Sequence, residues 1–276
     1  MTQILHDGRL CAESAASSRA LHYGDGVFRT LLWHDGQAVD WRAQFDKLKA
    51  DCAALALDAP DADTLVAELA QAVGVQASAA VKIIVARRTT GRGYAPVGSA
   101  SERWVQAYPL QHVHQSDYEQ GIAAILSSVR LSAQPLLAGV KHLNRLEQVL
   151  GSRDWPQGVR EALMCDAQGH VICGTRSNLF VVRNGALLTP RLDHCGVAGI
   201  MRAKIIDSAR RMHLHIEQAE LSADECLAAD EAFVCNALIG IWPLRALGKR
   251  AWPAPGALTR ELMRAIAHPL CRPARP

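Results

Sequence analysis

Four short segments of the chain combine residue types and spacings that could do chemistry. They are YGDGVFRT (residues 23–30), RRTTGRGY (87–94), GVKHLNR (139–145) and GVAGIMR (196–202). In GVKHLNR, Lys141 stands where an apolar, glycine-containing strand end meets the start of an expected helix. A lysine at such a junction can project into a cleft, where desolvation lowers its pKa and makes the amine nucleophilic. The alternative is an ordinary solvated lysine.

The other three segments are weaker signals when each is taken alone. The two glycines of GVAGIMR precede a helix, where free backbone N–H groups and the helix dipole suit a phosphate group. The three arginines of RRTTGRGY could grip carboxylates in bidentate fashion, or the segment could be a solvated surface loop. YGDGVFRT demands an unusual backbone around Asp25 and could equally be a tight structural turn.

Lysine is scarce in this chain, which narrows the choice of a nucleophile. Only six of the 30 basic side chains are lysines. The five besides Lys141 lie in expected helices (Lys47, Lys49, Lys204), in a polar turn (Lys249) and in a strand with outward alternation (Lys82). The chain has no GxSxG, HExxH or GxxxxGK[ST] motif, and neither of its His-x-His pairs has a third ligand nearby, so we expect no metal site.

The composition is that of a globular protein with a substantial core. Of 276 residues, 49% are hydrophobic and 21% charged, and the net charge of +3 gives no footprint for nucleic acid. No apolar run approaches the roughly 18 residues of a membrane span, and no signal peptide is recognisable. Eight cysteines without CxxC spacing are expected to be buried thiols in a reducing, cytoplasmic environment.

The first half of the chain shows helices and strands in alternation. Apolar periodicity predicts a helix over 42–55 and a second helix that Asp61 caps, and apolar runs predict strands at 81–86 and 103–110. The polar connector QHVHQSDYEQG follows. We therefore expect a smaller N-terminal α/β domain over 1–112 and a larger C-terminal domain over 113–276.

The second half contains several hairpin signals. We expect a strand at 122–129 and a helix around 142–152, followed by two hairpins, the second of which turns at Asn184-Gly185. A helix then runs to residue 213, and Ser222 and Glu225 have capping-box spacing. A strand at EAFVCN and a last helix over 257–267 complete the pattern. This mixture favours an α+β fold of two domains over a doubly wound sheet.

Taken in order, the four segments resemble the fold-type IV pyridoxal-phosphate enzymes, which include D-amino-acid and branched-chain aminotransferases. The resemblance extends from about residue 4 to about residue 272. It also includes the segments SNLF (177–180), LTPRLDHCGVAGIMR (188–202) and CNAL (235–238). LAGVKHLNRLEQVL (137–150) and GRGY (91–94) look like the lyase branch, which implies conversion of 4-amino-4-deoxychorismate to 4-aminobenzoate and pyruvate for folate biosynthesis.

The resemblance also implies a D-amino-acid aminotransferase-like architecture, a homodimer, a pseudo-barrel sheet in the larger domain and a cofactor site between the two domains. Lys141 would bind pyridoxal 5'-phosphate covalently, and Thr30 would face the substrate. The implied cofactor-binding residues are Lys141, Lys47, Cys173, Asn178, Val197, Gly199, Ile200, Asn236 and Ala237. The implied substrate-binding residues are Tyr23, Arg87, Arg92 and Tyr94.

Two positions depart from the family pattern. Cys173 stands where the family has a glutamate that keeps the pyridine nitrogen protonated, and Lys47 stands where it has an arginine that contacts the phosphate. A neutral thiol pairs poorly with a pyridinium, and a lysine keeps the charge without the fork geometry. Three hypotheses remain: a lyase with a weaker electron sink, an aminotransferase of the same fold, and a degenerate homologue that only binds ligand or partner.

Overall fold

The chain forms two compact units in a computed structural model that describes residues 4–10, 17–89, 91, 93–110 and 113–271. Unit 1 comprises Met1–Gln111 and Val140–Asn144, and unit 2 comprises His112–Gly139 and Arg145–Pro276. The sequence-based division at residue 112 did not anticipate that a short piece containing Lys141 belongs with the N-terminal unit.

Unit 1 is built on a six-stranded antiparallel sheet with the order β2-β1-β6-β5-β3-β4. Its strands are β1 (Ile4–His6), β2 (Arg9–Leu10), β3 (Gly26–His34), β4 (Gln37–Ala38), β5 (Ser78–Arg87) and β6 (Ser101–Tyr108). Its helices are α1 (Arg19–Tyr23), α2 (Trp41–Ala54) and α3 (Ala62–Val73). The Asp61 side chain caps α3 by accepting a hydrogen bond from the Thr64 amide, as its position in the sequence predicted.

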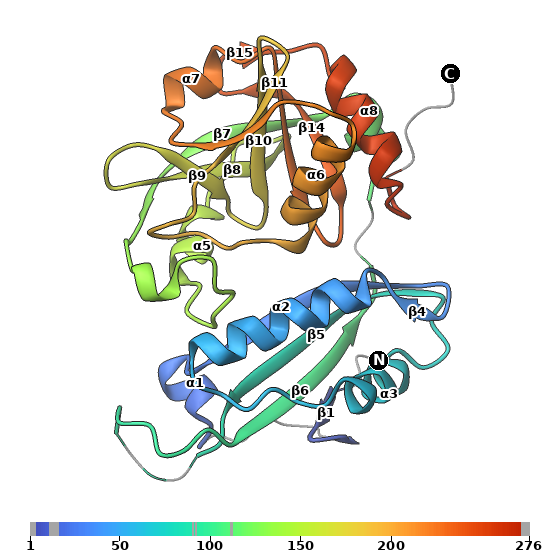
Figure 1. Cartoon of the computed structure of the whole chain (residues 1–276), viewed down its shortest axis with the longest axis vertical. Coiled ribbons are helices and arrows are strands. Elements are labelled where there is room, and N and C mark those ends of the chain that lie inside the picture. The colour runs from blue at the N-terminus through green and yellow to red at the C-terminus, as the bar shows by residue number, and fades with distance from the viewer. Residues whose placement is uncertain (1–3, 11–16, 90, 92, 111–112, 272–276) are drawn as a thin grey trace. The chain divides into compact units, whose positions relative to one another are not determined.

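Helices α2 and α3 cover one face of this sheet, and Figure 1 shows α2 lying over the strands. The core on this face combines apolar residues of both helices with those of the strands: Val27, Leu31, Leu48, Cys52, Leu65, Leu69, Val81, Ile83 and Val105. Successive side chains of a strand point to opposite faces. Phe28, Thr30 and Lys82 therefore lie on the face that the helices leave uncovered.

Unit 2 is built on a nine-stranded mixed sheet with the order β12-β11-β10-β13-β14-β7-β8-β9, in which β15 also pairs with β14. Its strands are β7 (Ile122–Leu131), β8 (Val159–Asp166), β9 (Val171–Gly174), β10 (Asn178–Arg183), β11 (Ala186–Pro190), β12 (Ile216–Ala219), β13 (Glu231–Asn236), β14 (Gly240–Leu247) and β15 (Arg250–Ala251). The amide of Val171 donates to the carbonyl of Leu221, and His170 forms a bridge with Ser222. The sheet thus curls until its two ends meet.

The helices of unit 2 are short except for α6 and α8. They are α4 (Gln115–Glu119), the 3-10 helix η1 (Pro135–Leu137), α5 (Leu146–Gly151), α6 (Ile200–Arg211), α7 (Ala223–Leu227) and α8 (Ala257–Ile266). Figure 1 shows α6 and α8 side by side, and both contribute to the core, with Met201 and Ile205 from α6 and Leu262 and Met263 from α8. Among the residues described, no helix has the length and apolar character that a membrane crossing requires.

Most of the elements expected from the sequence are confirmed. The hairpin at Asn184-Gly185 joins β10 to β11, both turn residues have positive φ, and Ser222 with Glu225 forms the capping box of α7. The helix expected around 142–152 is wrong at its start, because α5 begins only at Leu146. Residues 141–143 are extended instead, since the Lys141 carbonyl accepts from the Phe28 amide and the Leu143 amide donates to the Gly26 carbonyl.

Candidate active site

Lys141 is held on the uncovered face of the unit 1 sheet. Its carbonyl oxygen lies 2.9 Å from the amide nitrogen of Phe28, and its neighbour His142 forms a bridge with Val27. The Lys141 ammonium nitrogen lies 4.4 Å from the centroid of the Phe28 ring. A cation over an aromatic face is attracted by the ring quadrupole. The main-chain hydrogen bond therefore fixes the backbone of Lys141, and the Phe28 ring attracts its ammonium group.

Thr30 and Lys82 lie beside this lysine on the same face. They are direct partners across β3 and β5, and the Lys82 ammonium lies 4.9 Å from the Phe28 centroid. Burial lowers the pKa of Lys82. Sequence alternation correctly indicated that Lys82 points away from the helices, but we took that direction to mean solvent. Lys82 is thus a candidate functional residue that the sequence argument passed over.

Tyr23 and Tyr94 form an aromatic pair at the end of α1. Their ring centroids are 5.3 Å apart, and the amide of Gly93 donates to the Tyr23 hydroxyl. The Tyr94 side chain is largely exposed, so its ring is open to a ligand. Arg92, which we also predicted to contact substrate, lies outside the described residues.

Arg87 does not fit the substrate-binding role that the resemblance implied. Its side chain is buried, with only 5% of its surface exposed, and its Nε donates to Asp25. The other guanidinium nitrogens donate to the carbonyls of Leu55, Ala56 and Gly98. We correct the prediction accordingly, because each nitrogen of the Arg87 guanidinium already donates to a protein acceptor. The side chain stabilises the fold of unit 1 and does not bind a substrate carboxylate.

Lys47 belongs to a buried charge cluster on α2. Its ammonium pairs with Asp51 one turn later, and the same carboxylate lies 3.5 Å from the Arg29 guanidinium. Gln44 accepts two further hydrogen bonds from Arg29. Two cations therefore share one carboxylate, and Lys47 is the more exposed of the two. This leaves one net positive charge, which suits an anionic group.

The segment before α6 supplies backbone donors in unit 2. Helix α6 starts at Ile200 after the cap residue Gly199, and amides in the first turn of a helix have no acceptor within the helix. Asn178 fixes this segment from both sides, because its amide nitrogen donates to the Val197 carbonyl and its oxygen accepts from the Gly199 amide. The Gly139 carbonyl also accepts from the Ala198 amide. The Gly199 amide is therefore taken, and the first-turn amides from Ile200 onward remain the better anion donors.

Cys173 lies on β9 in an apolar cluster with Leu131, Met164, Ile172 and Cys195. The neighbouring strand carries Glu161, a buried carboxylate that the sequence argument missed. Its two oxygens accept from the Ala162 amide, the Thr175 amide and hydroxyl, and the Ser177 hydroxyl. These four donors bind Glu161 as a structural group. The side chains that cluster with Cys173 are apolar, which suits an aromatic ring better than a cation.

Asn236 and Ala237 begin the turn from β13 to β14. The Asn236 side-chain oxygen accepts from the amides of Leu238 and Ile239, and its nitrogen donates to the Arg176 carbonyl. The imidazole of His268 lies 3.1 Å from the Ala237 carbonyl oxygen. The turn is therefore rigid, as a loop that contacts a ligand should be.

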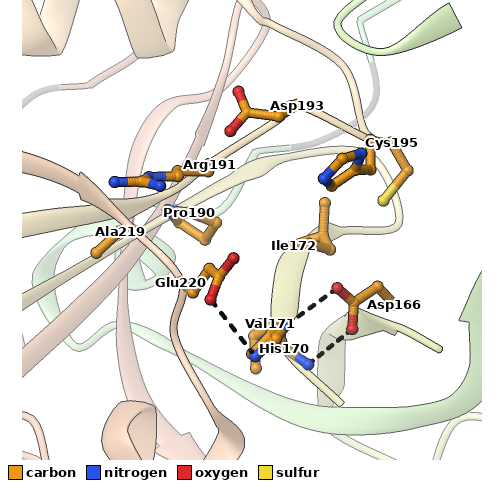
Figure 2. A pocket seen from close by; sticks show the side chains of 11 residues that line it. Asp166, His170, Val171, Ile172, Pro190, Arg191, Asp193, Cys195, Ala219 and Glu220 are labelled. Carbon is orange, nitrogen blue, oxygen red and sulfur yellow. Dashed lines mark hydrogen bonds and ion pairs between the residues drawn. The ribbon is translucent and has the colours of Figure 1, made fainter. Parts of the chain in front are cut away.

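A small pocket in unit 2 is lined by none of the predicted cofactor residues, but Ile172 and Cys195 of its lining also belong to the apolar cluster of Cys173. Figure 2 shows Asp166, His170 and Glu220 around it, with dashed lines from His170 to both carboxylates, and Cys195 among the other side chains that line it. Its volume of about 30 Å³ is enough for one or two water molecules. In the described parts of the chain, no three His, Cys, Asp or Glu side chains are arranged to hold a metal ion.

Comparison with known proteins identifies the family. The sequence profile of the family described as amino-transferase class IV matches residues 26–247, so the chain belongs to this family, whose members use pyridoxal phosphate. An aminodeoxychorismate lyase of Vibrio harveyi is 33% identical over 250 residues, which is 88% of this chain and 92% of the relative.

Two further relatives are a lyase and a putative aminotransferase. The crystal structure of a 4-amino-4-deoxychorismate lyase from Pseudomonas aeruginosa superimposes with a TM-score of 0.91 at 38% identity, covering 98% of this chain and 100% of that one. A putative branched-chain-amino-acid aminotransferase of Methanocaldococcus jannaschii is 29% identical over 84% of this chain and 82% of the relative. The expected α+β, fold-type IV architecture is thereby confirmed.

Proposed function

We propose that this chain is a pyridoxal-phosphate-dependent lyase that converts 4-amino-4-deoxychorismate into 4-aminobenzoate and pyruvate for folate biosynthesis. The observation that carries the proposal is the end-to-end similarity to the Pseudomonas aeruginosa lyase, with 98% of this chain covered at 38% identity. The placement of the Lys141 amine against Phe28 supports it, because the reaction needs a held but mobile amine.

The proposal assigns each cofactor-binding residue a role. Lys141 binds it covalently, while Lys47 and the backbone of Val197, Gly199 and Ile200 hold its phosphate. Asn178 fixes that backbone, Asn236 and Ala237 form a rigid turn beside the cofactor, and Cys173 faces its ring nitrogen. The supporting observations are the net positive charge of the cluster that contains Lys47, the first-turn amides of α6 and the apolar cluster around Cys173.

The chain's own residues then bind substrate and move protons. When bound, the cofactor withdraws electrons from the carbon that carries the substrate amine. The Lys141 amine, released when the substrate amine takes its place, would take the proton from that carbon, and the Thr30 hydroxyl would hydrogen-bond the ether oxygen of the departing enolpyruvyl group. Tyr23, Tyr94 and Arg92 bind the substrate. Lys82 replaces Arg87 in our assignment as the cation for a substrate carboxylate, since its ammonium shares the Phe28 ring with Lys141.

The direct test is release of pyruvate from 4-amino-4-deoxychorismate, followed by coupling to lactate dehydrogenase, with and without added pyridoxal phosphate. We expect cofactor-dependent pyruvate formation in one-to-one ratio with 4-aminobenzoate. Transfer of an amino group to a keto acid, without pyruvate release, would instead assign the aminotransferase activity named for the Methanocaldococcus relative. Absence of both reactions in protein that takes up the cofactor would leave the degenerate homologue.

Cys173 gives a prediction about cofactor affinity. We expect Cys173→Glu to bind pyridoxal phosphate roughly 10-fold more tightly than Cys173→Gln, which has the same shape without the charge. The reason is that a carboxylate stabilises a protonated ring nitrogen, and a tenfold change corresponds to about 1.4 kcal/mol. Titration of the apoprotein by fluorescence measures both affinities. Equal affinities for the two variants would show that residue 173 does not face the ring nitrogen.

The proposal includes a homodimer. Helix α5 exposes Leu146, Val149 and Leu150 at helical spacing on one side, and Leu136 of η1 is also exposed. Apolar side chains grouped in this way are typical of protein interfaces.

The proposal also includes a cytoplasmic location, which is supported by the described cysteines: all seven are free and buried, as expected in a reducing compartment.

Charged substitutions among the exposed apolar side chains of α5 are predicted to change the oligomeric state. The double variant Leu146→Glu/Val149→Glu is expected to halve the mass measured by light scattering, because each new carboxylate would have to be buried unpaired. The control is Val75→Glu, at a fully exposed valine after α3. A wild-type protein that is already monomeric, or a double variant that keeps the wild-type mass, would contradict the assignment of this surface.

A further inference from the structure

The carboxylate of Asp25 joins two buried arginines in unit 1. One of its oxygens, Oδ2, accepts from the Nε of Arg19 at 2.8 Å and from the Nε of Arg87 at 3.0 Å. Both arginine side chains are nearly inaccessible, and Asp25 is largely buried. Charged groups held in this way form stronger hydrogen bonds than neutral ones. The aspartate of the YGDG motif is therefore more than a turn residue.

The remaining donors of these arginines hold one stretch of chain at two points. Nη1 of Arg19 donates to the Gly93 carbonyl at 2.8 Å, and Nη2 donates to the Tyr94 carbonyl at 3.0 Å. Nη1 of Arg87 donates to the Gly98 carbonyl at 2.6 Å. Segment 93–98 otherwise lies on the surface and contains two glycines with positive φ. The conformation of segment 93–98 thus depends on the guanidinium groups of Arg19 and Arg87, both of which also donate to Asp25.

Aromatic contacts continue the same connection to the Tyr94 ring. The Arg19 guanidinium lies 4.8 Å from the Tyr23 ring centroid, and Tyr23 in turn meets Tyr94 edge to face. The Tyr23 hydroxyl also accepts from the Gly93 amide at 3.3 Å. Arg19 therefore restrains Tyr94 through its backbone and, by way of Tyr23, through its ring.

The glycines on either side of Asp25 explain why the carboxylate is placed so firmly. Gly24 ends α1 in the left-handed conformation, with φ of 63°. A Cβ at Gly26 would lie 2.5 Å from the Val85 carbonyl oxygen, so only glycine allows β3 to approach β5 this closely. The Asp25 carbonyl also accepts from the Arg87 amide. The backbone thereby locks Asp25 between helix α1 and the end of β5.

We infer that Asp25 and Arg19 are positioning residues that set the conformation of segment 93–98 and so present the Tyr94 ring to the substrate. The inference rests on the proposed function in one respect, namely that Tyr94 contacts the substrate. Neither residue touches the reacting atoms in this assignment. Arg19 acts through Gly93 and Tyr94, and Asp25 acts through Arg19 and Arg87.

The test compares Arg19→Met with Arg88→Met. Arg88 lies in the same region but is half exposed and pairs with Asp7 at the surface, so it is a matched control. For Arg19→Met we expect amide hydrogen exchange of peptides spanning 93–98 to quicken at least 10-fold, KM for the substrate to rise about 10-fold, and kcat and cofactor affinity to change less than twofold. Arg88→Met should leave all four quantities near wild type.

Milder variants keep the test decisive if Arg19→Met folds poorly. Arg19→Lys keeps the charge beside Asp25 but cannot reach two carbonyls at once, and Tyr23→Phe removes only the acceptor for Gly93. Both should show intermediate exchange. Unchanged exchange in segment 93–98, or a fall in kcat at constant KM, would overturn the inference. Hydrogen exchange requires no substrate, so it decides the positioning role even if the wild-type protein releases no pyruvate and the proposed function fails.

Discussion

Lys141→Ala is expected to lose pyruvate formation by about 10³-fold or more, because in our proposal one side chain supplies both the covalent link to the cofactor and the proton acceptor. The variant should also lack the absorption band of lysine-bound cofactor, while non-covalent binding through the phosphate persists. No other described lysine can take over at the same place, since Lys82 approaches Phe28 from β5 and not from the segment between η1 and α5 that carries Lys141.

Lys82→Met is the matched control for this experiment. It removes the second ammonium from the same aromatic ring, so it should keep the absorption band and mainly raise KM for the substrate. Both variants should unfold close to the wild-type temperature, because each loses a cation–π contact of about 1 kcal/mol. Retention of a tenth of the activity by Lys141→Ala, or loss of the band in Lys82→Met, would reverse the roles that we assign to the two lysines.

The features that the sequence predicted well are those that depend on neighbours in the chain. The Asn184-Gly185 turn, the Asp61 cap and the Ser222–Glu225 capping box each need only a few consecutive residues, and all three are present in the structure. The conformation after Lys141 depends on Gly26 and Phe28, more than a hundred residues earlier. Local helical preference there is overridden by hydrogen bonds that the local sequence does not reveal.

The site residues divide along the same line. A loop with three arginines suggests a site that binds carboxylates. The Arg87 guanidinium, however, already donates hydrogen bonds to Asp25 and to the carbonyl groups of residues 55, 56 and 98. For Lys82, strand alternation showed the face but not the Phe28 ring that lies there. The missing glutamate at Cys173 was visible in the sequence, whereas the saturated carboxylate of Glu161 beside it was not.

The buried ion pair between Arg29 of β3 and Asp51 of α2 should produce the largest change in stability. Asp51 is 1% exposed and Arg29 is 4% exposed, and burial lowers the pKa of Arg29, which its pairing with Asp51 opposes. Removing one partner of a buried ion pair leaves the other uncompensated at a cost of about 3–5 kcal/mol. We therefore expect Asp51→Leu to lower the free energy of unfolding by roughly that amount, measured by urea denaturation of the apoprotein. Arg29→Met should lower it by less, because Lys47 still pairs with Asp51.

The double variant Arg29→Met/Asp51→Leu separates charge imbalance from lost packing. With both charges gone, Gln44 and the more exposed Lys47 are the polar groups that remain in the cluster. The double variant should therefore be more stable than Asp51→Leu, in which Arg29 is left buried without its carboxylate. Additive losses in the double variant would instead mean that packing and not pairing holds the cluster. The Asp51→Leu variant also tests the role of Lys47, because the Lys47 ammonium loses the carboxylate that it shares with Arg29. If Lys47 binds the cofactor phosphate, Asp51→Leu should lower stability and yet tighten binding of pyridoxal phosphate, two opposite effects that loss of folding alone could not produce.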